Sequence, residues 1–297
     1  MRKTEEFADI YRDLETRSGP EILSAILDAQ RRGLSAIGPV LPDLAAAAEA
    51  AADRLRGGSG RIIYAGAGTS ARLGVQDGVE LVPTFGWPEA RLAYLIAGGP
   101  GALTRTAEGA EDNAEQARKD AQNLEPDAGD VCVALSASGT TPYAIAACEA
   151  ARAAGALTVA VANNPGAPLL EAAEHAILID SGPEPVGGST RMTAGTTQKV
   201  ALNLFSTLTM IRLGRVYRGM MVDVTPTNAK LRERAVRIVS AGADCDAETA
   251  RVALDTTGYA VKPAILVASG IAPKDAARLL EVHGGDLHAV FAAREDG

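Results

Sequence analysis

The 297-residue sequence has few cysteines, histidines and aromatic residues, and no excess of positive charge. Its cysteines, Cys132, Cys148 and Cys245, are far apart and in apolar surroundings, so they predict buried thiols rather than a disulfide framework or a metal cluster. The three histidines also lack the spacing of metal ligands, so we expect no metal. The formal net charge of −8 argues against a nucleic-acid or anionic-membrane partner, because either would need a basic face.

Long hydrophobic runs are also absent. No window approaches the roughly 18 uninterrupted apolar residues that a membrane-spanning helix needs. The N-terminal segment is charged and lacks the apolar core of a signal peptide. The sequence therefore predicts neither export nor a membrane span, and we expect a cytoplasmic protein.

Alanine is abundant, and short apolar runs alternate with helical patterns. Five runs are rich in apolar residues and end in glycine or polar turn residues, which is typical of buried strands. They lie at 61–68, at 90–99, at the beginning of 130–155, at 157–165 and at 175–182. Strands that alternate with helices indicate a parallel sheet covered on both faces, so we expect an α/β fold.

Further helical patterns flank the sheet region. Residues 20–58 predict two helices with a proline-containing break, and residues 196–217 predict one long apolar helix. From about residue 226 the pattern changes to several short helices with polar joints. We therefore expect N-terminal helices over 1–57, a ligand-binding α/β domain over 58–225 and a small helical domain over 226–297.

Two turns that follow strands carry groups suited to a phosphate. Ligands of parallel sheets bind beyond the carboxyl ends of the strands. The first turn opens a helix, whose free N–H groups and dipole favour an anion. The second offers hydroxyl groups that can surround a phosphate without a cation, although one of them could instead cap the following helix. The residues are Gly68, Thr69 and Ser70 in the first turn, and Ser136, Ser138, Gly139, Thr140 and Thr141 in the second.

A third polar cluster supplies hydroxyl groups and positive charge. Ser189 and Thr190 precede Arg191, and Lys199 follows eight residues later. The arginine and the lysine could neutralise substrate charge, or each could belong to a structural ion pair. We include all four among the predicted substrate-binding residues.

Two glutamates are candidates for acid–base chemistry. Glu80 lies in the apolar run 79–87, where an unpaired carboxylate is costly unless it serves a site. Glu111 follows the glycine-rich segment 98–101, which could bring an acidic helix start into a sugar pocket. Each could instead be a cap or a solvated residue, and the sequence alone leaves open whether the two converge. Asp77 is expected to orient the backbone or a neighbouring helix rather than to react.

With these segments in place, the chain resembles the N-acetylmuramic acid 6-phosphate etherases of the sugar isomerase (SIS) domain superfamily. The similarity extends from about residue 58 to the C-terminus. It is carried by YAGAGTSARLGVQDGVELVPTFG, IAGGPGAL, EGAEDN, ALSASGTTPY, GPEPVGGSTRMTAGTTQK, LGRVYRGMMVDV, TNAKLRERA and VKPAIL. The order and spacing of so many blocks make the resemblance more specific than any single motif.

The resemblance implies a SIS-type parallel sheet flanked by helices, with a small C-terminal helical domain. It also implies cleavage of the lactyl ether of N-acetylmuramic acid 6-phosphate, giving N-acetylglucosamine 6-phosphate and D-lactate, with no cofactor. It assigns acid–base function to Glu80 and Glu111. Phosphate binding falls on Ser136, Ser138 and Thr141. The family further implies a homodimer that shares its sites between subunits, for which the helix over 196–217 is a candidate interface.

The sequence departs from the family pattern in three places. Ala71 and Thr193 stand where glycine and lysine are frequent, and TEEFADIYRDLETRS replaces the usual N-terminal opening. A methyl group at position 71 would narrow the first turn, and loss of the lysine would remove a charge near the substrate.

Two other functions remain open. One is a SIS-type sugar-phosphate isomerase, which would use a glutamate and the same phosphate loop. The other is a non-catalytic sugar-phosphate sensor that regulates a partner protein, like the related eukaryotic regulator of glucokinase. The presence of both glutamates and of the C-terminal helical domain favours the etherase.

Overall fold

A computed structural model describes residues 3–224, 226 and 228–295. The chain forms two compact units, each with its own hydrophobic core. Residues up to Gly78, together with Ala90–Ser206, form the first unit, and Val79–Glu89, together with residues from Thr207 onward, form the second. The helical unit thus includes the segment 79–89, where the carbonyl groups of Phe85 and Gly86 accept hydrogen bonds from Arg215.

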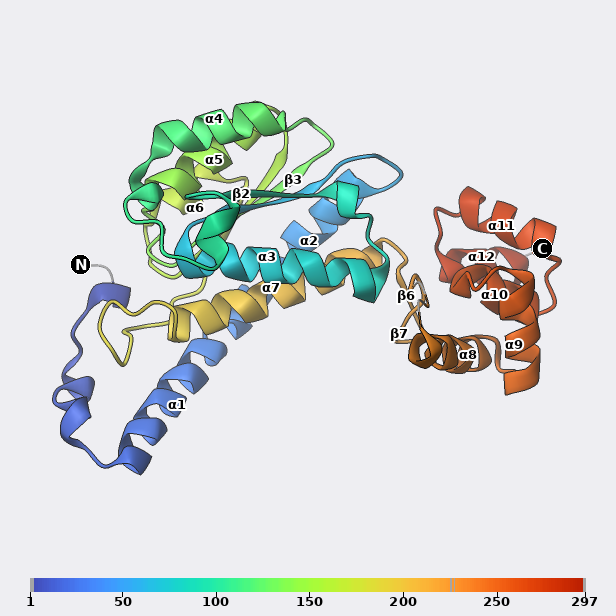
Figure 1. Cartoon of the computed structure of the whole chain (residues 1–297), viewed down its shortest axis with the longest axis horizontal. Helices are drawn as coiled ribbons and strands as arrows, with labels where there is room; N and C mark the ends of the chain where they lie inside the picture. The colour runs from blue at the N-terminus through green and yellow to red at the C-terminus, as the bar shows by residue number, and fades with distance from the viewer. Residues whose placement is uncertain (1–2, 225, 227, 296–297) are drawn as a thin grey trace. The chain divides into compact units, whose positions relative to one another are not determined.

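A five-stranded parallel sheet lies at the centre of the first unit (Figure 1). The strands follow the order β2-β1-β3-β4-β5, with Gly66 of β1 opposite Leu135 of β3. They are β1 (Ile62–Gly66), β2 (Leu92–Ile96), β3 (Val131–Ser136), β4 (Leu157–Ala162) and β5 (His175–Leu178). All five predicted strands, and the α/β class that they imply, are confirmed.

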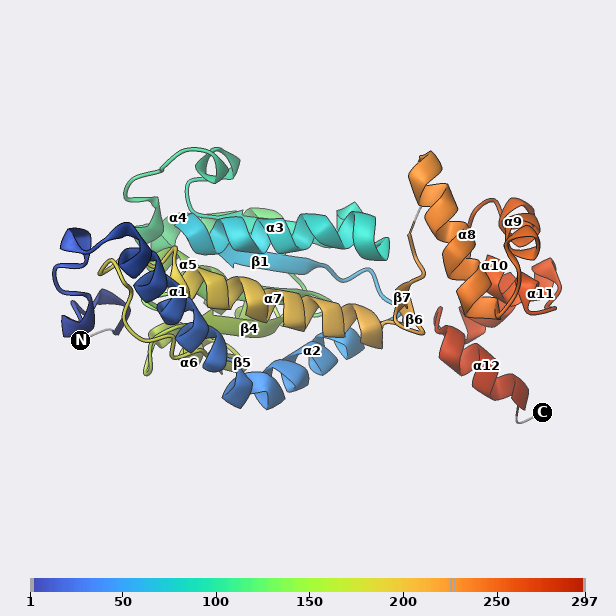
Figure 2. The same ribbon diagram turned by 90° about the horizontal axis from the view of Figure 1, so that it is seen from below.

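Helices cover both faces of this sheet (Figures 1 and 2). One face carries α4 (Ala114–Leu124), α5 (Pro142–Ala153) and α6 (Pro168–Ala172), and the other carries α2 (Leu41–Leu55), α3 (Gly68–Phe85) and α7 (Thr193–Arg212). The first face is packed largely through alanine, for example Ala65 and Ala134 on the strands and Ala117 and Ala147 on the helices. Small side chains let helices approach the sheet closely at interior packing density, which accounts for the alanine-rich composition.

The N-terminal helices confirm the predicted pair with a break between them. Helix α1 (Gly19–Ser35) starts with a capping box, in which the Glu21 carboxylate accepts from the Ser18 backbone N–H. Helix α7 ends at Arg212, five residues before the predicted end. Gly214, with φ of +70°, takes a left-handed conformation that stops the helix, and the chain enters the hairpin β6 (Val216–Tyr217) and β7 (Met220–Met221).

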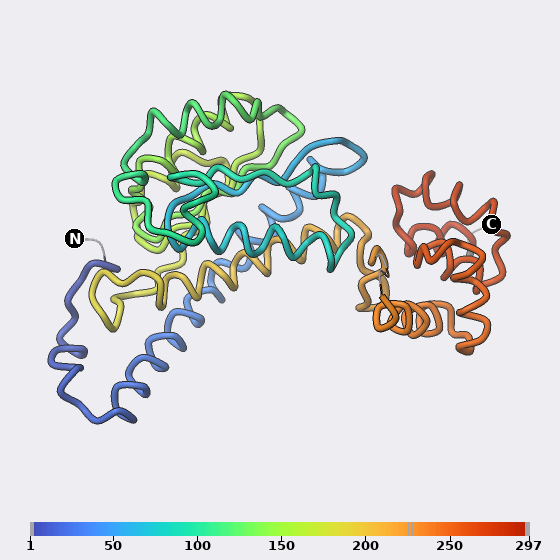
Figure 3. The backbone as a smooth tube through the Cα atoms, viewed as in Figure 1, coloured from blue at the N-terminus to red at the C-terminus, as the bar shows by residue number. Residues whose placement is uncertain are grey.

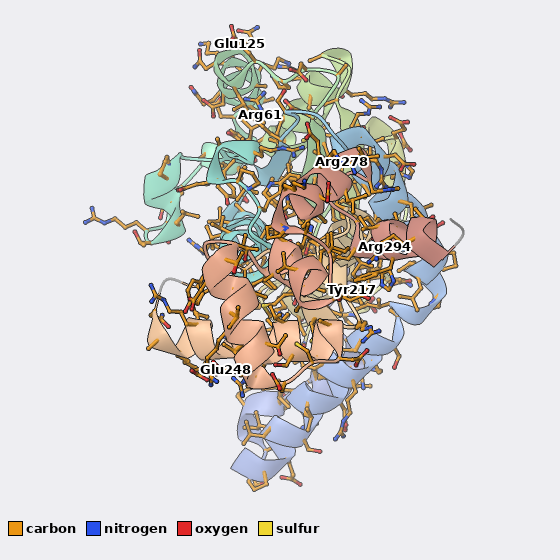
Figure 4. All side chains as sticks on the ribbon, turned by 90° about the vertical axis from the view of Figure 1, so that its right-hand side faces the viewer. Arg61, Glu125, Tyr217, Glu248, Arg278 and Arg294 are labelled. Atoms are coloured by element: carbon orange, nitrogen blue, oxygen red, sulfur yellow. The ribbon has the colours of Figure 1, made fainter. Side chains whose placement is uncertain are left out.

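Five short helices make up most of the second unit (Figure 3). They are α8 (Ala229–Ala243), α9 (Ala247–Thr256), α10 (Val261–Ala268), α11 (Pro273–Val282) and α12 (Leu287–Glu295). Tyr217, labelled in Figure 4, packs its ring on His288 and Phe291 of α12 at centroid distances of 4.7 and 5.8 Å. The hairpin thereby belongs to the core of the helical unit.

An ion pair secures the amino ends of β1 and β3. Arg61, labelled in Figure 4, lies 2.6 Å from the carboxylate of Asp130, which is 1% exposed, and also donates to the carbonyl oxygen of Glu125. Burial raises the pKa of Asp130, but hydrogen bonds from Arg61 and from the backbone N–H groups of Arg61 and Asp127 outweigh it, so this pKa lies below its ordinary value. The ionised carboxylate therefore stabilises the fold.

Replacing Asp130 by asparagine should lower the free energy of unfolding by about 2–3 kcal/mol at pH 7, because the substitution leaves Arg61 without its charge partner. A depressed folded-state pKa contributes stability above the unfolded value of about 3.9, and that stability is lost as the pH falls through the folded value. In urea unfolding, the difference between the two proteins should therefore stay about constant from pH 7 to about pH 4 and shrink at lower pH. Asp53→Asn, in an exposed pair with Arg56, is the control and should cost less than about 1 kcal/mol. Equal losses in the two variants would contradict the role of Asp130.

Candidate active site

The strand order predicts a crevice at the carboxyl ends of the strands. The chain passes from β1 to β2 on one side, and then returns to β3, β4 and β5 on the other side of β1. The direction of winding therefore reverses between β1 and β3. In open parallel sheets a ligand binds beyond the carboxyl ends of the strands at such a switch point. The turns that follow Gly66 and Leu135 meet at this point.

A cavity of about 600 Å³ opens there, and all its described lining residues belong to the first unit. It brings together both predicted phosphate turns, part of the third polar cluster and one predicted glutamate. The lining residues are Glu5, Ala67, Gly68, Thr69, Ser70, Glu111, Asp112, Ser136, Ala137, Ser138, Thr140, Thr141, Pro142, Gly188 and Thr190.

The hydroxyl groups of the second turn form a connected cluster. The Ser136 hydroxyl shares hydrogen bonds with those of Thr141, at 2.8 Å, and Ser138, at 3.2 Å. Thr140 donates to Ser138 through both its backbone N–H and its hydroxyl. Thr141 occupies the N-cap position of α5 without a side-chain capping bond. The hydroxyls thus line the cavity instead of closing the end of the helix.

Gly139 shapes the second turn from behind. Its φ is +68°, and a Cβ atom there would lie 2.3 Å from the Cβ of Ala167. The Gly139 N–H donates to the Ser136 hydroxyl at 3.0 Å. Only glycine tolerates both the positive φ and the close approach to Ala167. Gly139 therefore keeps the shape of the turn and does not itself line the cavity.

The first turn is equally tight. Helix α3 begins at Gly68, two residues after the end of β1, so its first N–H groups face the cavity. A Cβ atom at Gly66 would lie 2.9 Å from the carbonyl oxygen of Leu135, and glycine is therefore needed where the two strands end. The Ser70 hydroxyl donates to Gln198 of α7 at 2.8 Å, which ties this turn to the neighbouring helix of the same layer.

The loop before α7 supplies the wall that contains Gly188 and Thr190. Glu184 is buried, and its two carboxylate oxygens accept from the backbone N–H groups of Thr193 and Ala194 at 2.8 and 2.9 Å. A carboxylate in this position caps the helix and complements its dipole. Glu184 therefore fixes the loop end that carries Thr190 into the cavity.

Glu111 lies between two adjoining cavities. It lies on a 3₁₀ turn, Ala110–Asp112, just before Asn113, whose side chain caps α4 by accepting from the Gln116 N–H. Glu111 lines the main cavity and also an adjoining cavity of about 380 Å³, and Ala67, Gly68 and Thr69 are common to both. A carboxylate in this position can reach groups on either side of a bound sugar.

The main cavity has no basic side chain among its described lining residues, whereas Glu5, Glu111 and Asp112 contribute three acids. A bound phosphate would have to be held by hydroxyls and by backbone N–H groups at the starts of α3 and α5. The expectation that Arg191 and Lys199 face the substrate finds no support in their positions. Both are exposed, and Lys199 is hydrogen-bonded to Asn203, one turn further along α7.

Glu80 is not among the described lining residues of either cavity and belongs to the second unit. Its side chain is exposed, so the expectation of an apolar environment is wrong: the hydrophobic residues around it point to other sides of α3. Glu80 follows Gly68 by 12 residues on the same helix, which at 1.5 Å per residue is about 18 Å along the axis. Ser189 is half-buried outside the lining, next to Thr190.

Asp77, one turn before Glu80, fulfils its predicted role. It accepts hydrogen bonds from Tyr64 of β1 and from Asn203 and Ser206 of α7. Burial raises its pKa, and these three hydrogen bonds oppose the increase. Asp77 therefore joins the sheet to the helix layer.

Comparisons with known proteins decide the family. A family model described as the glucokinase regulatory protein N-terminal SIS domain matches residues 43–152, and the SIS domain model matches residues 108–208. The N-acetylmuramic acid 6-phosphate etherase of Deinococcus radiodurans is 47% identical over 99% of this chain and 96% of its own length. Those of Cronobacter sakazakii and Yersinia pestis are each 46% identical over 94% of this chain, and over 94% and 95% of their own lengths. The chain belongs to the N-acetylmuramic acid 6-phosphate etherase family.

A solved structure from Bacteroides fragilis, a candidate phosphosugar isomerase involved in capsule formation, shares the fold of this etherase family member. Its TM-score is 0.53 and its identity 16%, over 68% of this chain and 95% of its own. At this level of identity the similarity shows the fold alone. The predicted SIS-type architecture is thereby confirmed.

Two departures from the etherase pattern lie outside the cavity. The Ala71 methyl group packs with Ile96 and Ala102 in a small apolar cluster. The Thr193 side chain is buried, and its methyl group lies 2.5 Å from the position that a Cβ atom on Gly33 of α1 would take. Both side chains pack into the fold and lie outside the described lining of the cavity.

Neither Glu5 nor Asp112 was among the residues predicted for the site of this etherase family member. Asp112 follows Glu111 and shares its turn, so proximity could have indicated it. Glu5 is 62 residues before Ala67, the next lining residue along the chain, and nothing local in the sequence signals its position. Only the path of the N-terminal arm brings it to the cavity.

No group of three or more His, Cys, Asp or Glu side chains is placed to hold a metal ion among the described residues. In that same part of the chain, no helix is long and apolar enough to cross a membrane.

Proposed function

We propose that this protein cleaves the lactyl ether of N-acetylmuramic acid 6-phosphate, giving N-acetylglucosamine 6-phosphate and D-lactate. One observation carries the proposal beyond family membership. The cavity at the switch point combines a hydroxyl-lined turn suited to a phosphate with the carboxylate of Glu111. Its volume of about 600 Å³ is within the usual range for a small-molecule site.

The phosphate end of the substrate would be bound by the second turn. Ser136, Ser138 and Thr141 offer hydroxyls that can rotate to donate to phosphate oxygens, once they exchange their mutual hydrogen bonds for ligand contacts. Backbone N–H groups at the start of α5 add further donors. This recognition requires no cation, in keeping with the acidic lining.

The ether would be cleaved by elimination followed by hydration. Opening of the pyranose ring places an aldehyde at C1, which makes the proton on C2 acidic. A carboxylate takes this proton, a carboxylic acid protonates the departing lactyl oxygen as the C3–O bond breaks, and a double bond forms between C2 and C3. Addition of water then returns a proton to C2 and places a hydroxyl on C3. We assign the two carboxyl groups to Glu111 and Glu80, with Glu80 assisting the leaving group.

Glu80 would act on the site of a second copy of the chain. Its exposed position, about 18 Å along α3 from the lining residue Gly68, supports action between subunits over action within one chain. An apolar surface suited to dimerisation is present on α1, where Leu23, Leu27 and Leu34 are 69%, 50% and 42% exposed. The long helix α7, named above as a candidate interface, is mostly buried within the fold, although Leu204 and Ile211 stay partly exposed.

Incubation of the unaltered protein with N-acetylmuramic acid 6-phosphate should release D-lactate and N-acetylglucosamine 6-phosphate in equal amounts. A coupled D-lactate dehydrogenase assay with excess EDTA measures the release, and EDTA should leave the rate unchanged. Saturable substrate binding without lactate release would support the sugar-phosphate sensor. Interconversion of an aldose phosphate and a ketose phosphate without lactate release would support the isomerase.

A further inference from the structure

The N-terminal arm is attached to the rim of the cavity by Thr4. This residue is completely buried, although it is only the fourth of the chain. Its N–H donates to the side-chain oxygen of Asn164, at 3.3 Å, and its hydroxyl accepts from the Asn164 amide nitrogen at 2.9 Å. Its carbonyl oxygen accepts from the Gly188 N–H at 3.2 Å. Asn164 follows β4 and Gly188 lines the cavity, so three hydrogen bonds fix the arm beside the site.

The residues on either side of Thr4 and Glu5 strengthen this attachment. Lys3 forms an ion pair with Asp180, which follows β5. The Phe7 ring lies over Gly187, where a Cβ atom would be 2.6 Å from the ring. The arm is therefore held before and after Glu5 by contacts that do not involve the Glu5 side chain.

Glu5 itself enters the cavity. It is one of the lining residues, and its carboxylate lies over Gly188, where a Cβ atom would be 3.1 Å from Oε2. Its neighbour Glu6 lies outside the lining, although both glutamates are exposed. Two adjacent glutamates thus have different surroundings, which makes Glu6 a matched reference for any effect of Glu5.

An ionised carboxylate accepts hydrogen bonds and donates none. It repels a phosphate, and it gains energy from O–H and N–H donors. We infer that Glu5 is a substrate-binding residue that accepts hydrogen bonds from hydroxyl or acetamido N–H groups of the sugar, while the second turn holds the phosphate. This inference rests on the proposed function for the identity of the sugar. Thr4 is the positioning residue that keeps the Glu5 carboxylate in the cavity.

The test compares binding of a sugar phosphate with binding of phosphate alone. Binding of N-acetylglucosamine 6-phosphate and of inorganic phosphate is measured by calorimetry for the unaltered protein and for Glu5→Gln and Glu6→Gln. Glu5→Gln should weaken binding of the sugar phosphate by about 10- to 100-fold, because a charge-assisted hydrogen bond is lost. Binding of inorganic phosphate should stay equal or become tighter, since a nearby negative charge is removed. Glu6→Gln should match the unaltered protein with both ligands.

Substitutions of Thr4 test the same inference through the position of the arm. Thr4→Val removes the hydroxyl that bonds Asn164 and should weaken sugar-phosphate binding in the same selective way, whereas Thr4→Ser should restore it. Equal loss of both ligands in Glu5→Gln, or no difference between Glu5→Gln and Glu6→Gln, would overturn the inference. Since these are binding measurements, they remain decisive even where no lactate is released, so failure of the proposed reaction and failure of the Glu5 inference are distinguishable.

Discussion

Replacing Glu111 by glutamine should reduce kcat for D-lactate release by about 10²- to 10⁴-fold, the usual contribution of a positioned general acid or base. Glutamine fills the same volume and keeps one hydrogen-bonding oxygen, but it cannot exchange a proton at neutral pH. Glu111 lines both adjoining cavities, so it is placed to reach a reacting centre that lies between the phosphate and the rest of the substrate. Steady-state kinetics in the coupled lactate assay would measure the loss.

The matched control for this variant is Glu115→Gln. Glu115 is exposed on the first turn of α4, near Arg118, four residues beyond Glu111. It should retain kcat within about twofold, since an exposed ion pair of this kind contributes little. Binding of N-acetylglucosamine 6-phosphate to Glu111→Gln should persist, because the phosphate turn is unchanged. Full lactate release by Glu111→Gln would remove this residue from the mechanism.

Much of the fold could be predicted because its signals are local. Each strand of the sheet is a short apolar run that ends in glycine or polar residues, and the parallel arrangement follows from the alternation with helices. The end of α7 was misplaced because the apolar pattern continues through Leu213 and Val216 into the hairpin. There the left-handed Gly214 stops the helix, and Tyr217 has its own packing partners in α12.

The candidate site could be predicted where its residues follow strands. The two turns that follow β1 and β3 were found because chain order and glycine or hydroxyl content mark them, and the switch point brings both to one cavity. Glu5 could not be found, since its position depends on the contacts of Thr4 with Asn164 and Gly188, which are more than 150 residues away. Arg191 is exposed and outside the described lining, and charge alone does not reveal the direction of a side chain, so its role stays a prediction.

Mixing two inactive variants should restore activity if Glu80 and Glu111 act together across a dimer. Glu80→Gln and Glu111→Gln should each lose about 10²-fold or more of the unaltered rate. In a dimer formed by both variants, one of the two sites would combine the intact Glu80 of one chain with the intact Glu111 of the other. Random exchange of subunits makes half of the dimers mixed, so equal amounts should recover about a quarter of the unaltered activity per chain.

The same experiment distinguishes action between chains from action within one chain. Subunits are exchanged by dilution and reconcentration before the lactate assay, and each variant treated alone is the control for recovery caused by the procedure. Recovery near a quarter would mean that each site takes its two glutamates from different chains, as the exposed position of Glu80 on α3 leads us to expect. If mixed dimers form, shown with differently tagged chains, and remain inactive, then Glu80 serves the site of its own chain. Full activity of Glu80→Gln tested alone would instead mean that Glu80 has no part in the reaction and would leave Glu111 as the acid–base group.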